Sequence, residues 1–158
     1  MSIEYLSYIA IRVADLDRAL RFYRDLLGFK EVSRFELDGP SPSARLLGRD
    51  EVPVRACFLE RDGTRIELQH LELPADAALS RPQGPRAQLG LSHIGLRISD
   101  FEKTVAELVR GGARVLKASR FSHPGLGSEV VIAEDPDGVR IELIEIPGDP
   151  RQPLGEPV

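Results

Sequence analysis

The heptapeptide DGTRIEL at residues 62–68 occurs again, with one change, as DGVRIEL at residues 137–143. In both copies an Asp-Gly pair, typical of a tight turn, leads into a segment in which aliphatic and charged residues alternate. Side chains of a β-strand point alternately to the two faces of a sheet, so Ile66 and Leu68 share one face and Glu67 lies on the other. The repeat therefore predicts two related units, each ending in a strand that presents a glutamate opposite its apolar face.

The segment before the first heptapeptide has the pattern of a strand, a helix and further strands. Asp15 has the position of a helix N-cap, and apolar residues then recur at helical spacing as far as Gly28, a residue typical of a helix end. Period-two alternation and turn residues predict strands at residues 3–13, 31–37, 44–48, 54–60 and 65–71. The first unit therefore has the order strand, helix and then further strands, which we describe as βαβββ.

The second unit restarts the same order, since IGLRISD at residues 94–100 matches IAIRVAD at residues 9–15. The helix that follows is capped by Ser99 or Asp100 and ends at Gly111-Gly112. Further strands are predicted at residues 113–118, 129–133 and 139–146, the last one preceded by the turn sequence Asp135-Pro136-Asp137-Gly138.

These patterns predict an α+β protein with two tandem βαβββ modules that form one curved mixed sheet, with the helices on its outer face. The expected modules are residues 1–73 and 91–146. Residues 74–90 are expected to be a linker and residues 147–158 a loose tail, because both segments are rich in proline.

The composition of the 158 residues is that of a globular protein, with 42% hydrophobic and 29% charged residues. The net charge of -4 and the scattered arginines argue against a nucleic-acid surface. No apolar run has the length of a membrane span, and the N-terminus lacks the layout of a signal peptide. The single cysteine, Cys57, lies in an apolar run and is expected to be buried filler. We therefore expect a cytoplasmic protein.

The strand faces that the helices leave uncovered carry the candidate functional residues. Period-two alternation places these side chains on that face: Tyr8, Arg12, Arg65, Glu67, Gln69, His93, Arg97, Arg140 and Glu142. Glu67, His93 and Glu142 are suitable ligands for a divalent cation such as Zn²⁺, Ni²⁺, Co²⁺, Mn²⁺ or Fe²⁺. The alternative is that His93 is a satisfied sheet histidine and that the glutamates pair with Arg65 and Arg140.

Several motifs together resemble the vicinal oxygen chelate superfamily, which includes glyoxalase I, methylmalonyl-CoA epimerase, extradiol dioxygenases and fosfomycin- and bleomycin-resistance proteins. They are the opening from Ile9 to Phe29, with DLDRA, FY and LGF, the restart at residues 93–100, and DPDGVRIEL at residues 135–143. By position, the resemblance implies metal ligands at Tyr8, Glu67, His93 and Glu142. Tyr8 departs from the His or Gln of metal-dependent members, which favours a three-ligand site with Tyr8 donating a hydrogen bond to substrate or to metal-bound water.

The oxygen-rich ligand set resembles the isomerase, epimerase and lyase branch, in which the metal polarises a carbonyl and a carboxylate moves a proton. The resemblance thus implies an enzyme acting on an oxygen-bearing small molecule, with Glu142 or Glu67 as the base. A metal-free ligand-binding or drug-sequestering protein is the alternative, and an Fe²⁺-dependent dioxygenase ranks third because it would need a second imidazole. His70 does not supply it, since a regular strand turns His70 away from Glu67.

The remaining candidates are substrate contacts. Arg12 and Arg97 can recognise an anion, or else neutralise neighbouring glutamates at the rim of the sheet. Gln69 shares the open face, and His123 is expected in a loop as a substrate contact or a surface residue. The family resemblance also implies a homodimer that binds a small molecule.

Overall fold

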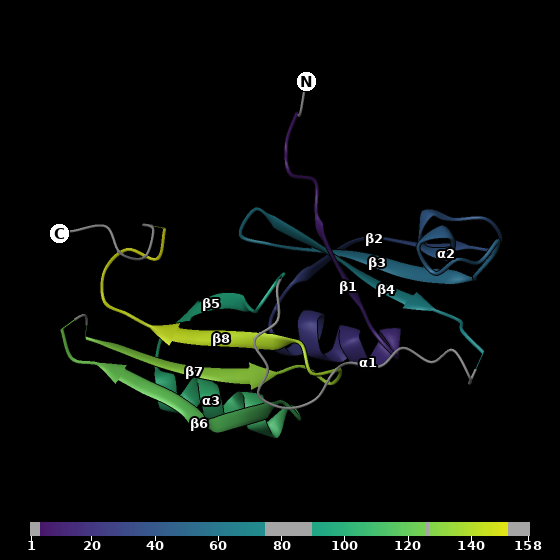
Figure 1. Cartoon of the computed structure of the whole chain (residues 1–158). Helices are drawn as coiled ribbons and strands as arrows, with labels where there is room; N and C mark the ends of the chain where they lie inside the picture. The colour runs from purple at the N-terminus through teal and green to yellow at the C-terminus, as the bar shows by residue number, and fades with distance from the viewer. Residues whose placement is uncertain (1–3, 75–89, 126, 152–158) are drawn as a thin grey trace. The chain divides into compact units, whose positions relative to one another are not determined.

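The computed structural model describes residues 4–74, 90–125 and 127–151 (Figure 1). The chain divides into two compact units, Met1–Pro82 and Gln83–Val158, and each has one four-stranded sheet. Within the described ranges, no helix has the length and apolar character needed to cross a membrane. The expected linker falls almost wholly on residues 75–89, outside the described part, and so does the tail from residue 152 onward.

The first unit has the predicted βαβββ order with one added helix. Its elements are β1 (Ile9–Arg12), α1 (Leu16–Leu20), η1 (Arg21–Leu26), β2 (Lys30–Leu37), α2 (Pro42–Leu46), β3 (Val54–Arg61) and β4 (Thr64–Leu71). The strands lie in the order β1-β4-β3-β2, with β1 parallel to β4 and the other neighbours antiparallel. The first strand is shorter than the predicted 3–13, since residues 4–8 have no strand pairing.

The second unit repeats this arrangement without an added helix. Its elements are β5 (Ile94–Ile98), α3 (Phe101–Arg110), β6 (Arg114–His123), β7 (Ser128–Glu134) and β8 (Arg140–Glu145). The order is β5-β8-β7-β6, again with only the first pair parallel. The α+β class with two βαβββ modules is therefore confirmed, each module having its own mixed sheet. That the two sheets join into one curved sheet stays a prediction.

The helix after β1 begins where the sequence indicates and changes its geometry halfway. The Asp15 carboxylate accepts a hydrogen bond from the Arg18 backbone N–H at 2.8 Å, as an N-cap does. From Arg21 onward the helix has π geometry, and the Leu27 N–H reaches the Phe22 carbonyl five residues earlier. It ends at Leu26, and Gly28 follows the C-cap Leu27 with a φ of 74°, which glycine adopts without strain. In the second unit the cap is Asp100, which accepts from the Lys103 N–H, and not Ser99.

The strand predicted at residues 44–48 is wrong, because this segment belongs to the short helix α2 and its end. Ser41 is the N-cap, with its hydroxyl accepting from the Ala44 N–H at 3.1 Å, and Pro42 occupies the first turn. A proline at the first helical turn loses no intrahelical hydrogen bond, so a Ser-Pro start favours a helix. Ala44 of this helix packs in a buried apolar cluster with Val52, Val54, Ala56 and Leu71.

The apolar residues of the repeated heptapeptide form the centre of each unit. Ile66 and Leu68 of β4, and Ile141 and Leu143 of β8, are almost fully buried, as their alternation predicts. In the first unit α1 packs against β3 and β4, and in the second α3 packs against β6. The side chains on the other face of each last strand, with Glu67 and Glu142 among them, are thus directed away from the helix-covered core.

The predicted turn before β8 is also confirmed. The buried Asp135 carboxylate accepts hydrogen bonds from the backbone N–H groups of Asp137, at 2.9 Å, and Val139, at 2.7 Å. Gly138, with a φ of 81°, completes the turn. This carboxylate therefore fixes the start of the strand that carries Glu142.

Candidate functional site

Glu67 is the most deeply buried carboxylate on the open face of the first sheet. It lies on β4 between Ala10 of β1 and Phe58 of β3, and is only 4% exposed. The Gln69 amide Nε2 donates a hydrogen bond to Glu67 Oε1 at 3.4 Å. Burial raises the pKa of the Glu67 carboxyl, and the hydrogen bond from Gln69 lowers that pKa in part. A carboxyl held in this way is more basic than an exposed glutamate.

A serine that the sequence analysis did not single out supports this arrangement. The Ser43 hydroxyl, on α2, donates to Gln69 Oε1 at 3.0 Å, while the amide group of Gln69 donates to Glu67. The hydrogen bond from Ser43 therefore fixes which end of the Gln69 amide faces the glutamate. Ser43 was missed because this segment was expected to continue into a strand. The Ser-Pro-Ser sequence at residues 41–43, a helix start, was the signal for it.

Aromatic rings lie beside Glu67 on the same face. Tyr8 precedes β1 and packs edge-on against Phe58, with the ring centroids 5.0 Å apart. The Phe35 ring of β2 lies 5.9 Å from that of Phe58 at an interplanar angle of 33°. Phe58 is the cross-strand partner of Glu67. Tyr8 thus lies on the glutamate's face, as predicted, and the sequence analysis named neither phenylalanine as a site residue.

In the second unit the structure brings His93 and Glu142 together. His93 immediately precedes β5, and Glu142 of β8 is the register partner of Gly95. His93 Nε2 lies 3.6 Å from Glu142 Oε2, and both side chains are partly exposed.

The His93–Glu142 pair has the chemistry of a metal half-site. Ser92 Oγ lies 2.9 Å from His93 Nδ1, and when the hydroxyl accepts this hydrogen bond, Nε2 keeps its lone pair free toward Glu142. Two ligand atoms about 2.1 Å from one tetrahedral cation stand about 3.4 Å apart, close to the separation seen here. Within the described part of either unit, no three His, Cys, Asp or Glu side chains are grouped to hold a metal. Glu67 comes from the first unit and the His93–Glu142 pair from the second.

The arginines on the open faces have different partners. Arg65 pairs with Glu60 at 3.0 Å, so the alternative in which it neutralises Glu67 is wrong. Arg12 is the register partner of Gln69 and lies on the face of Glu67. Arg97, expected to contact substrate, donates from its guanidinium to the backbone carbonyls of four consecutive residues, from Ile146 to Asp149. Its part in substrate binding stays a prediction, and its observed contacts are structural.

The two other histidines have contacts of their own. His123 is the last residue of β6 and not part of a loop, and its ring lies 6.1 Å from that of Phe121. His70 Nδ1 lies 3.3 Å from the Val13 carbonyl oxygen, next to the segment that leads into α1. This contact agrees with the prediction that His70 is turned away from Glu67.

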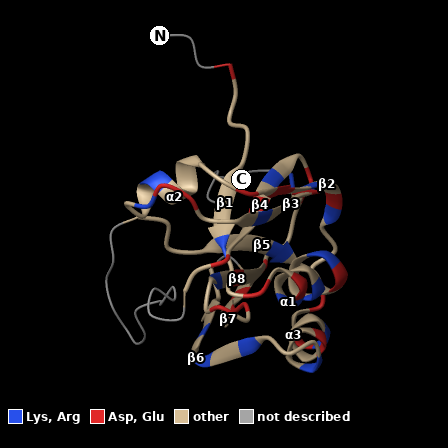
Figure 2. Ribbon diagram, turned by 90° about the vertical axis from the view of Figure 1, so that its right-hand side faces the viewer, with Lys and Arg blue, Asp and Glu red and all other residues tan. Residues whose placement is uncertain are grey.

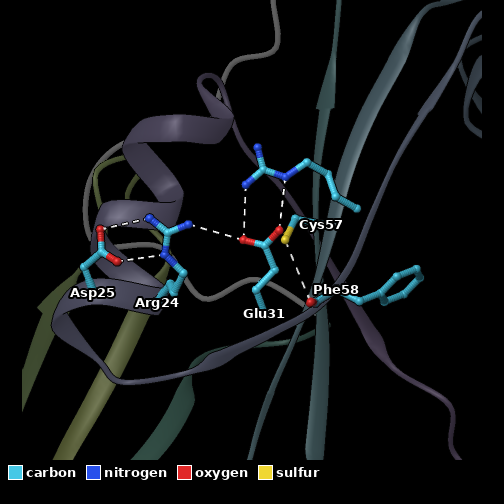
Figure 3. A network of polar contacts seen from close by, with 6 residues as sticks. Arg24, Asp25, Glu31, Cys57 and Phe58 are labelled. Atoms are coloured by element: carbon cyan, nitrogen blue, oxygen red, sulfur yellow. Dashed lines mark hydrogen bonds and ion pairs between the residues drawn. The ribbon is translucent and has the colours of Figure 1, made fainter.

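Cys57 is buried, as the sequence analysis expected. The thiol side chain is fully buried and lies near Glu31, whose carboxylate accepts hydrogen bonds from both Arg24 and Arg34 (Figure 3). The thiol is directed to the Phe58 carbonyl oxygen at 3.8 Å. Burial raises the pKa of the Cys57 thiol, which makes it a poor nucleophile at neutral pH.

The charges of the two units are mixed. Basic and acidic residues are interspersed on α1 and α3 (Figure 2). Together with the net charge of -4, this distribution gives no basic stripe along either helix.

Comparison with known proteins identifies the family. Residues 5–143 match the family model of the glyoxalase/bleomycin resistance protein/dioxygenase superfamily. The chain therefore belongs to this superfamily, as its motifs indicated.

The relatives and the solved structures agree with that assignment. A probable chloroplastic lactoylglutathione lyase of Arabidopsis thaliana is 31% identical over 96% of this chain, which spans only 37% of that relative. A probable lactoylglutathione lyase of Synechocystis is 27% identical over 89% of this chain and 95% of the relative. A glyoxalase family protein of Bacillus cereus superposes with a TM-score of 0.77 at 20% identity, covering 94% of this chain and 97% of the other. At this identity the structural match establishes the fold.

Proposed function

We propose that this chain is a metal-dependent enzyme that removes a proton next to a carbonyl of an oxygen-bearing small molecule, as an isomerase, epimerase or lyase does. The observation that carries the proposal is the pairing of His93 Nε2 with Glu142 Oε2 at 3.6 Å, on the sheet face opposite the core. The names of the relatives, lactoylglutathione lyases, support the same reaction class. They also suggest a glutathione adduct as the first substrate to test.

In this proposal Glu67, His93 and Glu142 hold a divalent cation, which when bound would polarise the substrate carbonyl. Glu67 is the preferred base. Its burial raises the pKa of the carboxyl, so the group accepts a proton more readily than an exposed glutamate. Gln69 and Ser43 orient this carboxyl by the two hydrogen bonds described above. Glu142 is the alternative base, because it has the corresponding place on β8.

A metal-free ligand-binding protein is the second candidate. Tyr8 favours it, because a neutral phenol is a weak ligand and the Tyr8 ring packs on Phe58. An Fe²⁺-dependent dioxygenase is less favoured because its second imidazole is missing, with His70 directed to the Val13 carbonyl. We further propose a cytoplasmic homodimer, on the family resemblance and on the soluble-type composition.

The test is the exchange of a substrate proton with solvent. The protein is incubated in D₂O with the hemithioacetal of methylglyoxal and glutathione, and deuterium incorporation into the product is followed by NMR. Exchange that is lost when a chelator removes the metal, returns when divalent cation is added back, and is lost in both Glu67→Gln and Glu142→Gln supports the proposal. Exchange that persists in both variants, or product without cation dependence, contradicts it. His70→Ala is the matched control, because it removes an imidazole that contacts the Val13 carbonyl and is outside the predicted ligand set.

A further inference from the structure

Three aromatic side chains form a continuous surface next to Glu67, which we call the aromatic patch (Tyr8, Phe35 and Phe58). The Phe58 ring lies between the other two, 5.0 Å from Tyr8 and 5.9 Å from Phe35. Because Phe58 and Glu67 are directly paired across β3 and β4, the patch begins at the carboxylate. The rings are thus within the reach of one small molecule that also contacts Glu67.

The aromatic patch remains open to solvent although its rings are apolar. Tyr8 is 43% exposed and Phe35 is 37% exposed, and Leu37 extends the apolar surface along β2. Phe35 is paired with Ala56, whose small side chain cannot cover the ring from the neighbouring strand. A cluster of exposed rings beside a buried carboxylate is unfavourable unless an apolar group covers it.

Polar groups border the same patch on its β4 side. Gln69 and Glu67 lie next to Phe58, and Arg12 is the register partner of Gln69. The face therefore combines a flat apolar surface with a base, an amide and a cation. This combination is complementary to a small molecule that has a flat apolar group on one side and oxygen atoms on the other.

We propose that the substrate carries an aryl or similarly flat conjugated group next to its reactive carbonyl, and that this group lies on the aromatic patch with Phe35 as the residue that sets the preference. The inference rests on the proposed function, because it places the carbonyl near Glu67. Phe35 is on the edge strand β2, so its ring can be changed with little effect on the core. It determines which substituent is preferred and takes no part in proton transfer.

The experiment compares two 2-oxo acids that differ only in the substituent, benzoylformate with a phenyl group and pyruvate with a methyl group. Dissociation constants are measured by titration calorimetry for the full chain and for Phe35→Leu, Phe35→Tyr and Leu46→Ala. Phe35→Leu keeps apolar bulk but removes the flat ring, and Phe35→Tyr restores the ring. Leu46 on α2 is an exposed apolar side chain outside the patch and serves as the matched control.

We expect benzoylformate to bind more tightly than pyruvate. Aromatic pairs contribute about 0.5–1.5 kcal/mol beyond area burial, so Phe35→Leu should weaken benzoylformate binding roughly two- to twelvefold and leave pyruvate binding unchanged. Phe35→Tyr and Leu46→Ala should retain the preference. Equal binding of the two acids by the unaltered chain, or an equal loss of both in Phe35→Leu, would overturn the inference.

Two further measurements separate this inference from the proposed function. Light scattering shows whether Phe35→Leu changes the oligomeric state, and such a change would mean that a second copy of the chain covers the patch, which overturns the inference. The D₂O exchange assay is run on the same protein preparations with the hemithioacetal as substrate, because benzoylformate has no hydrogen on the carbons next to its keto carbonyl. A phenyl preference without proton exchange contradicts the proposed function alone, whereas exchange without a phenyl preference contradicts the inference alone.

Discussion

Replacing Arg97 by alanine should destabilise the second unit and should not act primarily on substrate binding. The guanidinium donates to the carbonyls of Ile146 at 2.7 Å, Asp149 at 2.9 Å, Gly148 at 2.8 Å and Pro147 at 3.0 Å. These bonds tie the segment after β8 back onto β5. Removing the guanidinium leaves those carbonyls to water and frees the segment.

The expected magnitude follows from how exposed each bond is. The bonds to Ile146 and Asp149 are partly buried, whereas those to Pro147 and Gly148 are exposed and are readily replaced by water. A hydrogen bond to a charged group contributes about 1.5–3 kcal/mol, and bonds that share one guanidinium are not additive. We therefore expect a loss of about 2–3 kcal/mol in the free energy of unfolding. For a chain of this size, that loss lowers Tm by about 5–10 °C.

Urea denaturation followed by circular dichroism measures this change for Arg97→Ala and Arg97→Lys. Lysine keeps the charge but lacks the planar fork, so it should recover less than half of the loss. Arg110→Ala on α3 is the control, because that side chain is 74% exposed, and its effect should be within about 0.5 kcal/mol. An unchanged unfolding free energy in Arg97→Ala, together with a raised KM, would refute the structural role and restore Arg97 as a substrate contact.

Three further predictions concern Glu67, Ser43 and Asp135. Burial raises the pKa of Glu67, so the unfolded chain ionises first and the folded state loses stability as the pH rises above the usual 4.5. In metal-free protein, Glu67→Gln should therefore raise Tm at pH 7 relative to the unaltered chain but not at pH 3, and an equal effect at both pH values contradicts the pKa shift. Ser43→Ala should slow the exchange of the substrate proton in D₂O several-fold, while the unfolding free energy falls by no more than about 1 kcal/mol. Ser43→Thr keeps the hydroxyl and should restore the exchange rate. An unchanged exchange rate in Ser43→Ala contradicts the role given to Ser43. Asp135→Ala should lower the free energy of unfolding, measured by urea denaturation, by about 2 kcal/mol, because two backbone N–H groups lose their acceptor. Asp135→Asn keeps an acceptor oxygen and should recover part of this loss.

The sequence was sufficient for features that depend on local periodicity. The repeated heptapeptides predicted the strands that bury Ile66 and Ile141, because period-two alternation is set by the backbone itself. Gly28 and Asp15 marked the ends of the first helix for equally local reasons. The same alternation placed Glu67 on the open face, where the structure has it.

Features that depend on contacts distant in the sequence were missed. Arg97 donates a hydrogen bond to the carbonyl of Asp149, which lies 52 residues later in the chain, and no local pattern indicates that contact. Ser43 is joined to Gln69 only because α2 folds over the end of the sheet. The π geometry of η1 was also missed, because the spacing of its apolar residues is that of an ordinary α-helix. Phe35 and Phe58 have the sequence context of ordinary strand residues, and only the pairing of β2 with β3 brings their rings together.

The most direct test of the account is the metal content of protein purified without a histidine tag. It is measured by plasma mass spectrometry for the unaltered chain and for Glu67→Gln, His93→Ala and Glu142→Gln. His70→Ala is the matched control, since that imidazole contacts the Val13 carbonyl and is outside the predicted ligand set. The account predicts near-stoichiometric divalent metal in the unaltered chain and in His70→Ala, and its loss in each of the three ligand variants. A chain that takes up no metal after incubation with Zn²⁺, Ni²⁺, Co²⁺, Mn²⁺ and Fe²⁺, or that keeps its metal in His93→Ala, would contradict the proposed site.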